Sequence, residues 1–238
     1  MRVPALLAWG VLIATAMAQP ARLPAADDVL KNMEHAFAPI QDFSVTVIGD
    51  VNMESIRVPR TTATMYFKRP DKVHFASPTF SIIPREGMSP NPERFRSEYD
   101  ATTVGREDLG GRSVLKLQLA ARNPKARLRQ LFIWVDPSTW TLVKMASMPY
   151  EGRTISLEFE NGLVEGKYWL PSRLTALFGS AGEKAEPLFK VPEGAPNPAP
   201  QFEEMQRSFR SGVVTLTYRD YRVNAGLPDS LFEAGEKK

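Results

Sequence analysis

Short segments in which apolar and polar residues alternate make up most of the chain beyond residue 40. A period of two places neighbouring side chains on opposite faces, which predicts β-strands. The predicted strands are residues 43–47, 64–67, 113–119, 131–135, 141–145, 155–159, 168–176 and 213–221. The turn residues that separate them include Gly110-Gly111, Asp136-Pro137-Ser138, Glu151-Gly152 and Asn161-Gly162. Short strands that follow one another through hairpins predict a mainly β fold with one antiparallel sheet, flat or strongly curved.

One predicted strand ends in two cations and a proline. The run Thr64-Met65-Tyr66-Phe67 stops at Lys68-Arg69-Pro70-Asp71, and the alternation resumes at Val73-His74-Phe75. Proline fixes its own backbone and has no N–H to donate, so it sets a turn at this point. On the residues alone, Lys68 and Arg69 are solvated cations at the end of a strand.

A helix is expected near the N-terminus. Asp27 or Asp28 can cap a helix that runs to about Ala38, and Pro39 ends it. The apolar residues recur at near-helical spacing and form one stripe: Val29, Leu30, Met33, Phe37 and, past the end, Ile40. An apolar stripe of this kind has to be buried, so we expect the helix to lie against the sheet.

Two proline-interrupted segments do not fit the series of hairpins. Residues 84–96 and 187–200 are predicted as loops, the second as an extended arm. The arm leads into residues 201–210, where Phe202, Met205 and Phe209 form the apolar stripe of a two-turn helix. Residues 187–211 therefore predict a proline-rich arm with a short helix. That helix is either a movable cover or a crossover helix packed permanently on the sheet.

The first residues have the organisation of a secretory signal peptide. Arg2 begins a short basic region, residues 5–15 are apolar, and Ala16-Met17-Ala18 is a small-x-small cleavage site. The apolar core is shorter than the roughly 20 residues that span a bilayer, and an uncleaved anchor is the alternative. The sequence predicts residues 1–18 as a signal peptide cleaved after Ala18. The exported, soluble product is then one domain over residues 19–238.

Few residues of the chain suit catalysis or metal binding. There is no cysteine, which excludes thiol catalysis, zinc–thiolate sites, iron–sulfur clusters and disulfides. The two histidines, His35 and His74, have no metal-ligand spacing, and Ser180 lacks the Gly-x-Ser-x-Gly order of a nucleophile elbow. The net charge is only +3 and the charges are scattered. We therefore expect no enzyme, no cofactor, no metal and no nucleic-acid partner.

The same inventory favours a binding protein. A single good helix can cover only part of one face of a large curved sheet, so the concave side is expected to offer apolar side chains to a ligand. The alternative is that the helix fills the concave side as an ordinary core. The candidate cavity and cover residues are Met33, Phe37, Phe67, Trp134, Phe202, Met205 and Phe209.

The order of these features resembles a known family. An amphipathic helix is followed by residues 42–47 and then by residues 65–75, where a strand ends in Lys-Arg-Pro. Residues 105–112, 131–136, 218–224 and 231–232 agree with the family's later strands. Over most of residues 25–233 the sequence resembles the periplasmic lipoprotein carriers LolA and LolB and their RseB-like relatives. One departure is that residues 80–96 have proline and charge where the carriers have a hairpin and lid helices.

The resemblance implies an unclosed half-barrel with helices as a lid over an apolar cavity. It implies a periplasmic carrier of acyl chains, in lipoprotein sorting or outer-membrane lipid trafficking. Arg69 matches the arginine of the family's Lys-Arg-Pro motif, which holds the lid closed by bonding to its backbone. The expected partners are acyl lipid or lipoprotein cargo and, transiently, envelope membrane proteins, with the carrier itself a monomer. The alternative is an RseB-type signalling module that docks another envelope protein.

Overall fold

The computed structural model describes residues 22–53, 56–57, 59–76, 92–126, 128–147, 153–180 and 212–233. The helices in these ranges are α1 (Ala26–Phe37), α2 (Glu93–Glu98) and α4 (Ser230–Glu233). The strands are β1 (Asp42–Met53), β2 (Ile56–Arg57), β3 (Thr61–Lys68), β4 (Lys72–Ala76), β5 (Tyr99–Leu109), β6 (Arg112–Ala121), β7 (Gln130–Asp136), β8 (Thr141–Ser147), β9 (Arg153–Val164), β10 (Tyr168–Ser180) and β11 (Gly212–Val223). The expected signal peptide and the arm and helix expected over residues 187–211 lie outside the described residues, so both stay predictions.

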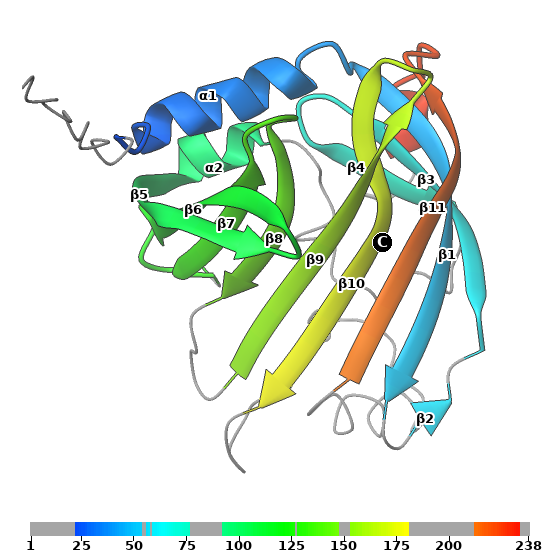
Figure 1. Cartoon of the computed structure of the whole chain (residues 1–238). Coiled ribbons are helices and arrows are strands. Elements are labelled where there is room, and N and C mark those ends of the chain that lie inside the picture. The colour runs from blue at the N-terminus through cyan, green and yellow to red at the C-terminus, as the bar shows by residue number, and fades with distance from the viewer. Residues whose placement is uncertain are drawn as a thin grey trace, which may run out of the picture.

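All of these strands belong to one antiparallel sheet. Their order is β4-β3-β1-β11-β10-β9-β8-β7-β6-β5, and β2 pairs with β1 off this path. In the described part of the chain, the end strands β4 and β5 do not pair with each other, so the sheet stays open. Figure 1 shows the sheet curving strongly, with α1 and α2 together on the side where β5 to β8 lie. The predicted fold class, a mainly β half-barrel made of one curved sheet, is confirmed.

The predicted strands all lie inside observed ones, but one predicted turn is wrong. Gly110 and Gly111 have φ of +62° and +82° and join β5 to β6, as a two-residue hairpin turn requires. Asn161 and Gly162, in contrast, lie within β9, where they pair with Pro171 and Leu170. The chain turns three residues later, at 165–167. The Asn-Gly pair does not form a turn here, because the pairing of β9 with β10 continues past it.

Helix α1 packs against the inner face of the sheet and against α2. Its buried residues are Ala26, Val29, Leu30, Met33 and Phe37, so the predicted apolar stripe is confirmed. Full burial of such side chains contributes about 1.5–3 kcal/mol each, which fixes the helix in place. The predicted aspartate cap is wrong. The N-cap is Ala25, without a side-chain bond, and Asp27 and Asp28 lie in the first turn, where the helix dipole favours them.

The inner face of the sheet forms the core, and β7 shows how the two faces differ. On β7, Leu131, Ile133 and Val135 are buried in the core cluster, and the alternate residues Phe132 and Trp134 point the other way. The expectation that α1 either covers a cavity or fills the concave side therefore has a mixed outcome. Its N-terminal part is ordinary core, and its C-terminal part borders the cavity described below.

A short helix stands where the sequence predicted a loop. Residues 84–91 lie outside the described residues, but residues 93–98 form α2. No residue of α2 is buried, so it has no apolar stripe from which the pattern could be recognised. Ion pairs stabilise it, within the helix from Arg94 to Glu98 and across to α1 from Arg96 to Glu34, both at 2.8 Å. Its one aromatic side chain, Phe95, is partly buried against the core.

Candidate functional site

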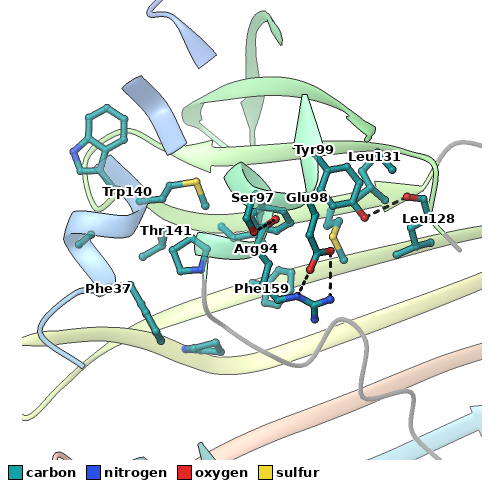
Figure 2. A pocket seen from close by; sticks show the side chains of 18 of the residues that line it. Phe37, Arg94, Ser97, Glu98, Tyr99, Leu128, Leu131, Trp140, Thr141 and Phe159 are labelled. Atoms are coloured by element: carbon teal, nitrogen blue, oxygen red, sulfur yellow. Dashed lines mark hydrogen bonds and ion pairs between the residues drawn. The ribbon is translucent and has the colours of Figure 1, made fainter. Parts of the chain in front are cut away.

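A cavity of about 640 Å³ lies between the two helices and the strands β7 to β10. Its walls come from α1, α2, the segment between β6 and β7, the turn before β8, and the ends of β9 and β10. The lining residues are Met33, Ala36, Phe37, Pro92, Arg94, Phe95, Ser97, Glu98, Tyr99, Ala121, Arg122, Asn123, Ala126, Leu128, Leu131, Trp140, Thr141, Leu142, Met145, Phe159, Asn161, Trp169, Leu170 and Pro171. Figure 2 shows many of these side chains pointing into one space from both helices and strands.

The inner wall of the cavity is apolar. Met33, Tyr99, Leu131, Met145 and Leu170 are all buried there. The one polar atom of this set, the Tyr99 hydroxyl, donates a hydrogen bond of 3.2 Å to the Leu128 carbonyl. Burial raises the pKa of Tyr99, so its hydroxyl stays protonated and uncharged. An apolar ligand can therefore lie against this wall without leaving a charged group unsolvated.

Two tryptophans stand at the edge of the cavity. Trp140 ends the turn between β7 and β8 with φ of 55°, a left-handed conformation that is uncommon for a bulky residue. Its backbone N–H donates to the Asp136 carbonyl at 2.7 Å, which holds the turn in this form. Trp169 on β10 is 42% exposed and pairs across the hairpin with Leu163, which is 51% exposed. These exposed apolar side chains enlarge the apolar surface at the entrance.

The exposed lining residues define a mouth, which consists of Ala36, Arg94, Ser97, Glu98, Arg122, Asn123 and Trp169. Arg94 donates to the Glu98 carboxylate from Nε at 2.8 Å, and this pair lies beside Tyr99 in Figure 2. The bond to Glu98 raises the pKa of Arg94. Arg122 donates from Nε to Asp100 at 2.9 Å and from Nη1 to the Ser97 carbonyl at 3.0 Å. The mouth is thus polar where the inner wall is apolar.

Arg69 connects the end of β3 to both helices. Its Nη1 donates to the carbonyl of Ala38, the C-cap of α1, at 3.0 Å, and its Nη2 donates to Glu93 at the start of α2. The neighbouring Lys68 reaches a different part of the chain, where Nζ donates to the Leu227 carbonyl at 2.8 Å. The two cations of the Lys-Arg-Pro sequence therefore fasten separate segments. The helices that Arg69 fastens are the ones that border the cavity.

The predicted cavity residues have different positions in the structure. Met33 and Phe37 line the cavity. Phe67 does not, because it is fully buried in the core, stacked on Phe43 at 5.1 Å and edge-on to Phe37 at 5.6 Å between ring centroids. Phe202, Met205 and Phe209 lie outside the described residues, so their role stays a prediction.

Trp134 is corrected to the outer face of the sheet. Its neighbours Ile133 and Val135 point into the core, so the strand alternation turns Trp134 outward. There its Nε1 donates to Glu107 at 2.6 Å, and Lys116 and Lys144 lie 5.0 and 5.6 Å from the ring centroid. The hydrogen bond from Lys116 and, to a smaller extent, the one from Trp134 lower the pKa of Glu107. The apolar run 131–135 had no alternation from which the face of Trp134 could be read.

Sequence reasoning missed most of the cavity wall. Phe95 comes from a helix that was predicted as a loop, and Trp140 comes from a turn. Phe159 and Trp169 are in predicted strands. They belong to the part of the β9–β10 hairpin that extends beyond β8, because among the described residues β8 pairs with residues 156–158 of β9. The sequence does not show which way the side chains of that extension face. In the described ranges, no three His, Asp or Glu side chains are grouped as a metal site would need. No helix there is long and apolar enough to cross a membrane.

Three solved structures have a similar fold over nearly their whole length. A DUF1329 family protein from Desulfovibrio piger has a TM-score of 0.61 at 14% identity, covering 89% of this chain and 97% of its own. A domain from Vibrio parahaemolyticus that is named as an outer membrane lipoprotein-sorting protein domain has a TM-score of 0.61 at 12% identity, covering 88% of this chain and 97% of its own. A LolA superfamily protein from Nitrosomonas europaea has a TM-score of 0.53 at 14% identity, covering 88% and 98%. The chain has the LolA-like fold.

The likeness lies in the structure rather than in the sequence. No protein-family model and no curated protein matches the chain. The LolA-like fold that the strand order and the Lys-Arg-Pro strand end led us to expect is nevertheless confirmed. At these identities the comparison establishes the fold, and the chemistry of the cavity has to be derived from the residues that line it in this chain.

Proposed function

We propose that this protein is an exported, non-catalytic carrier that binds lipid acyl chains in the cavity between α1, α2 and β7–β10. The observation that carries the proposal is the cavity of about 640 Å³ with a buried apolar wall and an exposed mouth. This volume lies within the roughly 300–1,000 Å³ of small-molecule sites. Each methylene group that leaves water for such a wall contributes about 0.8 kcal/mol.

A carrier has to admit and release its cargo, and Arg69 is the residue we assign to this step. It donates to the backbone of Ala38 and to the side chain of Glu93, so one side chain holds both helices that border the cavity. Movement of either helix away from the strands breaks a contact of Arg69 and opens the cavity. Arg69 is therefore proposed as a latch, and the monomer as the working unit.

The fold supports transport in the bacterial envelope as the setting of this activity. One of the similar structures is named for outer membrane lipoprotein sorting and another as a LolA superfamily protein. Together with the signal peptide predicted over residues 1–18, these names support an acyl lipid or lipoprotein as the cargo and the periplasm as the location. Envelope membrane proteins are then the transient partners that deliver and receive it.

A chain-length series tests the proposal. Neutral monoacylglycerols of increasing chain length compete with a fluorescent acyl probe for the purified mature protein. Affinity should rise about fourfold for each added methylene, which corresponds to ~0.8 kcal/mol, and then level off once the cavity is full. A folded protein that binds no member of the series saturably would refute the carrier and leave the RseB-type docking module as the alternative.

A matched pair of variants on α1 locates the site. Ala36 is exposed and lines the cavity, whereas its neighbour His35 is exposed and does not line it. Ala36→Trp should fill part of the cavity and shorten the chain length at which affinity levels off. His35→Trp introduces the same side chain at an exposed position of α1 away from the cavity and should leave the series unchanged. Only Ala36→Trp also gives up the helix propensity of alanine, a cost of about 0.5 kcal/mol, so the folded fraction of both variants is measured first. Equal effects of the two variants would place the binding site elsewhere.

A further inference from the structure

The mouth of the cavity is built for a polar group, since five of its seven residues are polar or charged and two of these are arginines. We propose that the ligand is an amphiphile with an anionic headgroup, a phosphate or a carboxylate, which lies against Arg94 and Arg122 while its chain fills the cavity. This inference rests on the proposed acyl-chain binding and adds the class of ligand. An uncharged hydrocarbon would use only the apolar wall and would leave the polar mouth without a function.

The hydrogen bonds of the two arginines leave donors for a ligand. Arg94 uses Nε and Nη2 on Glu98, and Arg122 uses Nε and Nη1 on Asp100 and the Ser97 carbonyl. Nη1 of Arg94 and Nη2 of Arg122 have no hydrogen-bond partner among the described residues. A guanidinium has five N–H donors, and a carboxylate on one edge fixes its plane for a second acceptor on the other. Both side chains are thus oriented and still have donors available.

The segment between β6 and β7 places a further cation beside the mouth. It contributes Arg122 and the exposed Lys125. Arg94 and Arg122 form ion pairs with Glu98 and Asp100, whereas the Lys125 side chain has no ion pair among the described residues. This cation and the donors that the two arginines leave available lie next to the apolar wall. Chain and headgroup are therefore recognised by adjacent parts of one site.

Three probes that share one chain length and differ in headgroup test the inference. Dodecyl phosphate and laurate are anionic, and monolaurin is neutral; each is titrated below its critical micelle concentration into the purified mature protein. Both anionic probes should bind about tenfold more tightly than monolaurin, as one charge-assisted bond at a partly exposed site gives. Arg94→Gln and Arg122→Gln should each remove most of this advantage and change monolaurin affinity less than about twofold.

Two further variants keep the test decisive if a glutamine variant does not fold. Lys125→Glu reverses one charge beside the mouth, in the segment between β6 and β7, without breaking a side-chain bond and should also weaken the anionic probes selectively. Arg112→Gln is the control, since Arg112 is exposed at the far end of β6, roughly 30 Å along the strand from Arg122. Inorganic phosphate separates the two sources of the anion. Displacement of dodecyl phosphate by millimolar phosphate alone supports a free-phosphate site, and no displacement supports a lipid headgroup.

The outcomes separate this inference from the proposed function. Equal affinity for all three probes, unchanged in Arg94→Gln and Lys125→Glu, would overturn the headgroup inference and leave acyl-chain binding standing. No binding of any probe would overturn both. If the variants weaken binding to phosphatidylglycerol vesicles but not to dodecyl phosphate, the cations act on a membrane surface and the headgroup inference is wrong.

Discussion

Arg69→Met removes the contact between the β3 end and both helices and keeps most of the aliphatic side chain. Two interactions are lost: a hydrogen bond of 3.0 Å from the guanidinium to the Ala38 carbonyl, and the ion pair with Glu93. A hydrogen bond to a charged group contributes about 1.5–3 kcal/mol when buried, and an exposed ion pair ~0.2–1 kcal/mol. The Arg69 and Glu93 side chains are 23% and 36% exposed, so water screens both interactions. We expect a loss of about 1–2 kcal/mol.

If Arg69 is a latch, this loss acts on the equilibrium between closed and open helices. An equilibrium shifts about 5- to 30-fold for 1–2 kcal/mol, so the dissociation rate of a bound acyl probe should rise by a similar factor. Stopped-flow displacement of the probe measures that rate, and a thermal melt of the unliganded protein measures stability. The apparent melting temperature should change little, because the buried residues Val29 and Leu30 still hold α1 on the sheet when the contacts of Arg69 are lost.

Lys68→Met is the matched control. Lys68 is the preceding residue, and its side chain is 29% exposed. Like Arg69, it donates to a backbone carbonyl, that of Leu227, and forms an ion pair with a carboxylate, that of Asp229. Its partners belong to the C-terminal segment, so its loss should lower the melting temperature and leave probe dissociation unchanged. If Arg69→Met lowers the melting temperature as Lys68→Met does and does not speed probe dissociation, Arg69 is a structural residue at the strand end and the latch is refuted.

Three more predictions follow from the packing. Leu30→Ala should lower the free energy of unfolding by about 2–5 kcal/mol in urea melts, because Leu30 is buried away from the cavity; a loss below ~1 kcal/mol would contradict its core position. Trp140→Asn should weaken acyl-probe binding with little change in stability, because asparagine tolerates the left-handed backbone; unchanged affinity would remove Trp140 from the site. Burial raises the pKa of Tyr218 and Tyr221 above the ordinary value of 10.0, so the folded state keeps protons that the unfolded state loses. Stability should therefore fall as pH rises past 10, and a Tyr218→Phe/Tyr221→Phe variant should show a flatter alkaline profile.

The sequence predicted the strands with an apolar face and missed those without one. Every predicted strand was found because its inward residues are large and apolar, as in β6 with Leu115, Leu117 and Leu119. The half-buried positions of β5 after Tyr99 include Ala101, Thr103 and Gly105. These residues are small, so β5 shows no apolar alternation and was missed. An edge strand needs less apolar surface than a central one, and period-two patterns detect it poorly for that reason.

The candidate site was harder to predict than the fold. Met33 and Phe37 line the cavity because a helical stripe points one way, and their role in binding stays a prediction. For Trp134, a run that is apolar on both faces leaves the side undecided. The mouth could not be foreseen at all. Arg94 and Arg122 are 28 residues apart in the sequence, and both line the cavity because Arg122 donates to the Ser97 and Glu98 carbonyls at the end of α2.

The position of β11 has a consequence for how the chain acquires its structure. β1 pairs with β11, so that Phe43 lies opposite Val223, and β11 also pairs with β10. Through the sheet, β11 is the one connection between the β4-β3-β1 part and the β10-to-β5 part in the described residues. A chain still being synthesised therefore has two incomplete half-sheets until nearly its last residues emerge, and pairing over such sequence distances is slow. For the exported carrier proposed above, late folding keeps the chain unfolded long enough to pass through a secretion channel.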